Sequence, residues 1–339
     1  MTSFKPSFKR LATAVAIGLL AAGAANAQFQ DRTFRMSNGV GKDHPMGHGT
    51  TKMNACTLEK SGGKMKVQGY WDFQLGNDLQ GLQATRSGTV DMVNTSTAPV
   101  AGVVPELGVF DLPFLFNSEK EADQLLDGKV GDWFNAKMPA AGLINLAWWE
   151  NGFRHMTNSK RPVNRLEDFS GIKMRVMQNK IYIDTFNTLG TNAVPLAFSE
   201  VYSALETKTV DAQENPFLNI QNMKFYEVQK YLTLTKHSYS PNMLLFSKKV
   251  WDGLSTQEQT VLKECAAQGR DVQRKINREQ SDASVAFFKS NGMLVNEIPA
   301  TEMTRIRERT KVIYEQAAKT IGAEPTNLVF NELKRIRGN

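Results

Sequence analysis

The sequence contains few of the side chains on which catalysis and metal binding usually depend. Only two cysteines and four histidines occur in 339 residues. It has no GxSxG nucleophile elbow, no Walker A loop and no GxGxxG fingerprint, and neither cysteine has a recognisable catalytic partner. These absences argue against a hydrolase or a nucleotide-dependent enzyme. We therefore expect a protein that is not an enzyme.

Two of the histidines, His44 and His48, have the spacing of a helical zinc pair. Pro45 and Gly47 interrupt a regular helical face between them, and no glutamate accompanies them as in HExxH. We expect neither a metal nor a cofactor.

Long apolar runs are missing after residue 27, where no segment approaches the eighteen apolar residues of a membrane span. Before that point, Lys5, Lys9 and Arg10 precede a short apolar run that closes with "ANA", residues 25–27. This pattern is typical of a secretory signal cleaved after Ala27. We predict a signal peptide over residues 1–27 and a periplasmic mature protein.

A strong charge of one sign is missing as well. The formal net charge is +7, and it falls to +4 without the signal, because three of the 41 basic and none of the 34 acidic residues lie there. We find no basic cluster with interleaved aromatic residues, so we expect no nucleic-acid partner. The mild positive charge is compatible with a small anionic ligand.

The two cysteines, Cys56 and Cys265, both fall in helix-like stretches. An even number of cysteines in an oxidising compartment permits one disulfide. Two buried thiols are the alternative, since cysteine behaves as a small hydrophobic residue.

Strand-like and helix-like segments alternate along the chain, which predicts an α/β fold with a largely parallel sheet. The expected strands cover residues 33–40, 64–71, 89–96, 143–149, 171–177 and 192–197. The expected helices cover residues 48–60, 78–88, 119–138, 180–190 and 199–209, and a mostly helical tail covers 255–339 with a long helix at 270–292. The pattern restarts after residue 151, so we expect a new sheet near residue 152 and two lobes.

The stretch "GIKMRVM", residues 171–177, places two cations on one face of its strand. On an exposed edge, Lys173 and Arg175 would both be solvated. However, ligands of open α/β sheets bind beyond the carboxyl ends of the strands. Because Arg154, Arg175 and Asn215 all lie near such ends, we expect them to converge on a cleft.

Several motifs together resemble the solute receptors of tripartite ATP-independent periplasmic (TRAP) transporters, of the C4-dicarboxylate-receptor type. They are "WENGFRHMTNSKRPV", "GIKMRV", "PLAFSEVYSALETKTVDAQENP" and "KFYEVQKYLTLTKHSYSP", with "SGGKMKV", "QLGND", "SGTVDMV" and "FDLPFLF" in the expected places.

The resemblance implies two α/β lobes with a ligand cleft between them and a long helix spanning both. We expect lobe I to comprise residues 28–151 and 241–280, and lobe II residues 152–240 and 281–339. The resemblance also implies a receptor that delivers a small organic acid to TRAP membrane permease subunits, and we expect a monomer.

By this resemblance, Arg175 receives the ligand carboxylate, since a guanidinium offers paired donors that match both oxygens. Arg154 corresponds to a second arginine that contacts ligand, and Asn215 to an amide beside it. The alternatives are a salt bridge for Arg154 and a turn residue fixed by Pro216 for Asn215.

Phe198 corresponds to an aromatic residue that packs on the ligand, although an aromatic before a helix is more often a core residue. Asp78 lies one residue later than the acid that many family members carry beside "QLG". The remaining candidates for ligand contact are His44, Phe73, Gln74, Asp78, Asn94, Ser96 and His155.

Two other functions stay open. A secreted enzyme for organic acids could use Glu150 or His155 as a base beside Arg154, and a receptor could present its ligand to a sensor kinase. The arginine pair requires a carboxylate, and the polar candidates suggest hydroxyl groups, which favours a sugar acid such as a uronate. C4-dicarboxylates, 2-oxo acids and pyroglutamate-like monocarboxylates are the alternatives.

Overall fold

The structure is a computed structural model that describes residues 1–3 and 29–338. The predicted signal peptide therefore lies outside the described residues, apart from its first three. Among the helices of residues 29–338, none combines the length and the apolar character needed to cross a membrane.

Nine strands of the described chain form one mixed sheet, in the order β2-β1-β3-β8-β4-β7-β5-β6, with β9 paired to β8. The pairs of β1 with β2 and β3, and of β5 with β6 and β7, are parallel, whereas β4 and β8 run antiparallel to each other. The strands are β1 Arg32–Asn38, β2 Met65–Tyr70, β3 Met92–Ser96, β4 Leu143–Asn158, β5 Lys173–Val176, β6 Asn192–Pro195, β7 Ala212–Pro216, β8 Tyr231–Ser247 and β9 Leu294–Glu297.

The expectation of a new sheet near residue 152 was wrong, because β4 continues through that point to Asn158. Its second part, "ENGFRHMTN", is polar and therefore resembles a loop. The structure instead buries these side chains within the sheet, where they find hydrogen-bond partners. The strand bends at register shifts such as the one between Glu150 and Gly152.

The helices that surround the sheet are α1 Pro45–Lys60, α2 Asp78–Ser87, α3 Thr97–Val100, α4 Glu119–Leu126, α5 Lys129–Asn135, α6 Lys180–Thr188, α7 Val201–Glu206, α8 Phe217–Asn222, α9 Lys248–Trp251, α10 Thr256–Ser290, α11 Ala300–Ile321 and α12 Ala323–Arg337. Helix α1 begins three residues earlier than predicted, since proline fits the first helical position, where no N–H partner is lost. The helix predicted over 119–138 is divided at Gly128, which has an extended backbone and precedes α5.

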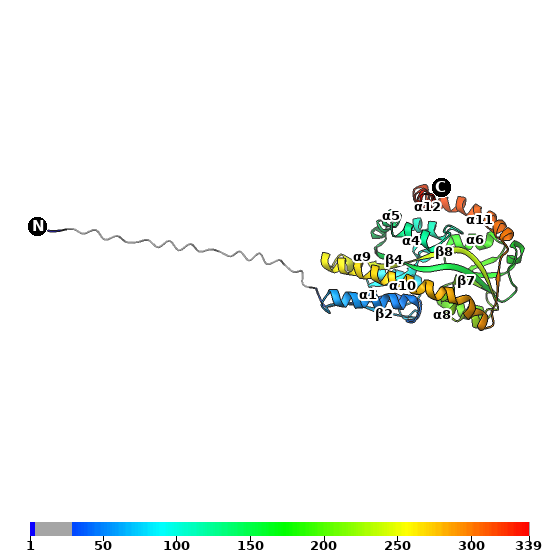
Figure 1. Cartoon of the computed structure of the whole chain (residues 1–339), viewed down its shortest axis with the longest axis horizontal. Coiled ribbons are helices and arrows are strands. Elements are labelled where there is room, and N and C mark those ends of the chain that lie inside the picture. The colour runs from blue at the N-terminus through cyan, green and yellow to red at the C-terminus, as the bar shows by residue number, and fades with distance from the viewer. Residues whose placement is uncertain (4–28, 339) are drawn as a thin grey trace.

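Helix α10 runs across the molecule and contacts α1, β4, α8 and β9 (Figure 1). Near its start a disulfide joins Cys265 to Cys56 of α1, with 5.5 Å between the two Cα atoms, which decides between the two alternatives for the cysteines. The two helices also pack closely at this point. A Cβ atom added to Gly269 of α10 would lie only 2.8 Å from the carbonyl oxygen of Gly49 in α1. Further along, α10 packs against β4 and then α8.

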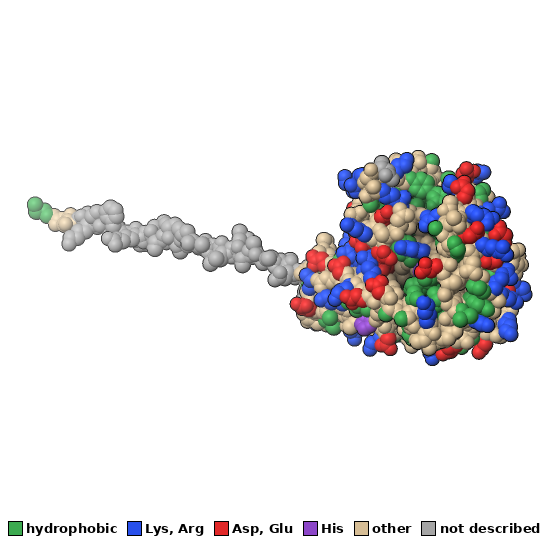
Figure 2. All heavy atoms as spheres, turned by 45° about the vertical axis from the view of Figure 1, so that its right-hand side comes forward, with side chains coloured by type: hydrophobic (Ala, Val, Ile, Leu, Met, Phe, Trp, Pro, Cys, Tyr) green, Lys and Arg blue, Asp and Glu red, His purple; other side chains and the backbone are tan. Residues whose placement is uncertain are grey.

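We define the first half as β1–β3 with α1–α3 and the 3₁₀ helix η1 (Pro105–Asp111), and the second half as β5–β7 with α6–α8. Each half packs its helices on its own parallel strands around apolar cores. The long strands β4 and β8 and helix α10 connect them. Figure 2 shows Lys and Arg side chains interspersed with Asp and Glu over the face that it draws.

Candidate functional site

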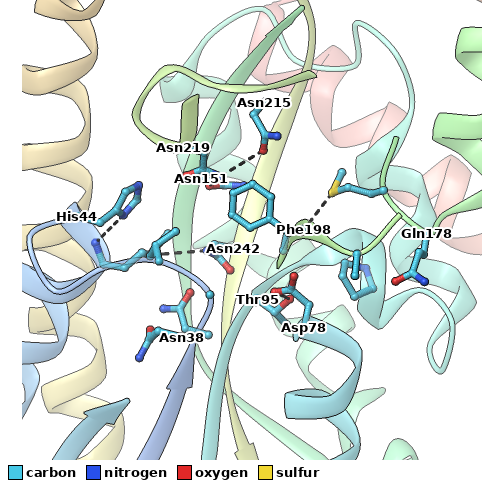
Figure 3. A pocket seen from close by; sticks show the side chains of 18 of the residues that line it. Asn38, His44, Asp78, Thr95, Asn151, Gln178, Phe198, Asn215, Asn219 and Asn242 are labelled. Carbon is cyan, nitrogen blue, oxygen red and sulfur yellow. Dashed lines mark hydrogen bonds between the residues drawn. The ribbon is translucent and has the colours of Figure 1, made fainter. Parts of the chain in front are cut away.

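A polar cavity lies where the strands of the two halves end. It encloses about 70 Å³ for the centre of a water-sized sphere, several times what one water needs. Figure 3 shows side chains of both halves converging on it, with Asn38 and Thr95 facing Asn151 and Asn215. The lining residues are Asn38, Gly39, Val40, His44, Met46, Asp78, Asn94, Thr95, Ser96, Pro99, Asn151, Arg154, Arg175, Met177, Gln178, Leu196, Ala197, Phe198, Asn215, Asn219 and Asn242.

Arg175 is buried in the wall of this cavity, whereas Lys173 of the same strand is exposed. Its Nε and Nη2 donate to the carbonyl oxygen of Leu196, at 3.1 and 2.7 Å, and its Nη1 has no partner within the protein. Burial lowers the pKa of Arg175 to about 10, so the guanidinium remains a cation at neutral pH. The ring of Phe198 lies 5.9 Å from the guanidinium.

Arg154 is fully buried and belongs to an ion pair as well as to the cavity wall. Its Nε and Nη2 donate to the carboxylate of Glu214 at 2.5 and 2.8 Å, and Nη2 also reaches Asn215 Oδ1 at 3.2 Å. Burial disfavours the Glu214 carboxylate, but Arg154 and His237 outweigh burial and lower its pKa to about 2. This pair fixes the guanidinium while its Nη1 stays unpaired.

Unpaired polar atoms concentrate at this cavity. Ten buried side-chain N or O atoms of the described residues lack a hydrogen-bond partner, and five of them belong to residues that line it. Buried polar groups are normally paired, because leaving one unsatisfied costs about 1–3 kcal/mol. The five atoms are Asn38 Oδ1, His44 Nε2, Asn94 Nδ2, Arg154 Nη1 and Arg175 Nη1. Such a set is suited to a polar ligand.

His44 is a hydrogen-bond donor in this set. It is the N-cap of α1, and its Nδ1 accepts from the backbone N–H of Met46 at 3.2 Å. Burial lowers the pKa of His44 to about 4, so the ring is neutral and its proton resides on Nε2. His48, its partner in the sequence spacing, is exposed.

Asp78 and Phe198 are two further predicted residues that line the cavity. Asp78 begins α2 and accepts from Thr95 Oγ1 at 3.2 Å, and burial raises its pKa. Phe198 packs edge-on against Phe73, with 5.8 Å between ring centroids. The predicted residues that line the cavity are Arg175, Arg154, Asn215, Phe198, His44, Asp78, Asn94 and Ser96.

Three predicted residues are not in the cavity wall. Phe73 contacts Phe198 without lining the cavity, and Gln74 is exposed. His155 stacks on Phe217, with 4.2 Å between ring centroids, and lines a separate crevice together with Glu150. The crevice and the cavity are thus lined by different residues of β4. Neither proposed enzymatic base, Glu150 or His155, lines the cavity.

Sequence reasoning missed Glu214 and most of the amide side chains. Glu214 lies in the same "QENP" motif as Asn215 and could have been suspected as the partner of a buried arginine. Asn38, Asn151, Asn219 and Asn242 come from four separate segments, and no spacing in the sequence connects them.

Comparison with known proteins shows which proteins this chain is similar to. Residues 36–333 match the family described as bacterial extracellular solute-binding protein, family 7 (DctP). The chain is 39% identical over 244 residues to the 2,3-diketo-L-gulonate-binding periplasmic protein YiaO of Escherichia coli, which covers 72% of this chain and 74% of YiaO.

Two solved structures have the same fold. The sugar acid binding protein DctPAm from Advenella mimigardefordensis, in complex with galactonate, is 43% identical with a TM-score of 0.89, covering 91% of this chain and 99% of that one. A TRAP periplasmic solute binding protein from Polaromonas, bound to D-erythronate, is 37% identical with a TM-score of 0.84, covering 88% and 97%. These likenesses confirm the two-lobed α/β fold.

Proposed function

Because this chain belongs to the bacterial extracellular solute-binding proteins of family 7, the receptors of TRAP transporters, we propose that its cavity captures a sugar acid for delivery to TRAP permease subunits. The observation that carries this proposal is the set of five unpaired buried atoms around the cavity. Proteins of this family bind solutes and do not need catalytic groups for that task.

The unpaired atoms describe the chemistry of the ligand. Four of them are donors, on His44, Asn94, Arg154 and Arg175, and one is an acceptor, on Asn38. Two donors belong to guanidinium groups, which bind a carboxylate best. The others suit hydroxyl groups, which both accept and donate. A monocarboxylate with several hydroxyls satisfies the whole set.

Asp78 favours the same class of ligand over a dicarboxylate. Its carboxylate lines the cavity, where it can accept from ligand hydroxyls but would repel a second ligand carboxylate. The three relatives described above support a sugar acid, since their names specify 2,3-diketo-L-gulonate, galactonate and D-erythronate. Both aldonates and uronates, the class favoured by the sequence, have the required groups.

We propose that binding closes the cleft by rotation of lobe I (28–151, 241–280) against lobe II (152–240, 281–339). The strands β4 and β8 and helix α10 are the connections that would bend. The predicted signal peptide and the family together support the periplasm as the location.

A thermal-shift screen of ligand-stripped mature protein tests this function. Purified protein is unfolded, washed, refolded and mixed with D-galactonate, D-erythronate, D-galacturonate, D-glucuronate, succinate, pyruvate or pyroglutamate. A ligand that binds only the folded state raises the melting temperature by mass action. We expect a large increase with sugar acids and none with succinate. An increase with succinate alone, or with no acid, would contradict the proposal.

A further inference from the structure

Asn179 lies at the seam between the two halves, four residues after Arg175, and only 8% of it is exposed. It is the N-cap of α6 in the second half, where its Oδ1 accepts from the backbone N–H of Ile181 at 2.9 Å. It does not line the ligand cavity, unlike its neighbour Gln178.

The amide nitrogen of Asn179 contacts two acceptors of the first half. Nδ2 donates to the carbonyl oxygen of Ala98 at 3.2 Å and to Asp111 Oδ2 at 3.0 Å. Asp111 is itself buried, and its other oxygen, Oδ1, accepts a hydrogen bond from Thr97 Oγ1 at 2.9 Å. One side chain therefore ties the start of α6 to both α3 and η1.

These contacts exist only while the halves are together, because every acceptor belongs to the first half and the donor to the second. The Asp111 carboxylate is also short of partners, since Thr97 and Asn179 are the side chains of the described residues that donate to it. A buried carboxyl group is stabilised by each such bond. Closure of the cleft would supply one of them.

We propose that Asn179 is a positioning residue, a latch that holds the cleft closed over a bound acid without contacting that acid. The inference rests on the proposed receptor function and adds a residue that controls how long the ligand stays. Because the latch forms on closure, its loss accelerates opening and thus dissociation, whereas encounter with the ligand is unaffected.

Two substitutions separate the latch from the helix cap. Asn179→Ser keeps a good N-cap but is too short to reach Ala98 or Asp111, and Asn179→Ala loses both the cap and the latch. Stopped-flow fluorescence with D-galactonate and with D-galacturonate would give association and dissociation rate constants for each protein. Thermal unfolding without ligand would report on the cap alone.

We expect dissociation to become roughly 10- to 100-fold faster in both variants, because the two buried hydrogen bonds that Asn179 makes across the seam are lost. The association rate constant should change less than threefold, and ligand-free Asn179→Ser should melt close to the wild type. A serine variant that dissociates like the wild type would overturn the latch alone. A wild type that binds neither acid would instead overturn the proposed sugar-acid function, and the latch with it.

Discussion

Arg175 is held by the carbonyl oxygen of Leu196, which accepts from both Nε and Nη2 at 3.1 and 2.7 Å. This carbonyl orients the guanidinium without neutralising it. The group therefore remains a buried cation whose Nη1 has no partner in the protein. A carboxylate that enters the cavity meets a fixed donor instead of a mobile one, which reduces the entropy cost of binding.

Replacing this guanidinium by an ammonium should weaken binding strongly. In Arg175→Lys we expect the Kd of a sugar acid to rise by roughly 100-fold, because lysine is a point charge without the planar pair of donors. Isothermal titration measures the change. Lys173→Ala is the matched control, since that cation of the same strand is exposed and should leave the Kd unchanged. Equal losses in the two variants would contradict the assignment.

Glu214→Gln should destabilise the protein by about 3–5 kcal/mol, because it leaves the buried Arg154 cation without its anion. Urea unfolding at neutral pH measures this change. Glu167→Gln is a suitable control, since the pair of Glu167 with Arg305 is exposed to solvent, which screens it, and should contribute little to stability. A loss at Glu214 no larger than at Glu167 would contradict a structural role for the buried pair.

The stability of the protein should fall as the pH falls below about 6.5. Burial lowers the pKa of His155 to about 3, so the unfolded chain binds a proton in this window that the folded protein does not. For one histidine the loss is about 2 kcal/mol at pH 5. Urea titrations of His155→Phe should show a shallower pH dependence than those of the wild type, and an unchanged pH dependence would contradict this role of His155.

Removing the disulfide should cost about 2–5 kcal/mol. Cys56→Ala combined with Cys265→Ala avoids placing new hydroxyls in a buried site and tests this by urea unfolding. Alkylation of the wild type under non-reducing conditions should find no reactive thiol. Modification of both cysteines in the urea-unfolded, unreduced protein would contradict the disulfide.

The sequence allowed the class of fold and the arginines of the cavity to be predicted, because both depend on local patterns. Alternation of apolar residues located most strands, and Arg154, Arg175 and Asn215 were found near strand ends. The same local reasoning failed at β4, where buried polar residues imitate a loop. It also assigned His155 to the wrong side of that strand, since the register shifts after Glu150 cannot be seen in the sequence.

The asparagines that line the cavity could not be predicted for a different reason. Asn38 and Asn242 lie about two hundred positions apart in the chain and meet only because β1, β3 and β8 are neighbours in the sheet. The pairing of Cys56 with Cys265 likewise depends on how α10 packs on α1. Such contacts follow from tertiary structure and leave no local spacing to detect.

The most direct test of the account is to remove the charge of the ligand while keeping its hydroxyls. Isothermal titration would compare D-galacturonate with its neutral methyl ester, using wild type and Arg175→Ala. We expect the wild type to bind the acid at least 100-fold more tightly than the ester, and Arg175→Ala to lose most of this preference. Equal affinity of the wild type for acid and ester would contradict the central claim that Arg175 reads a carboxylate.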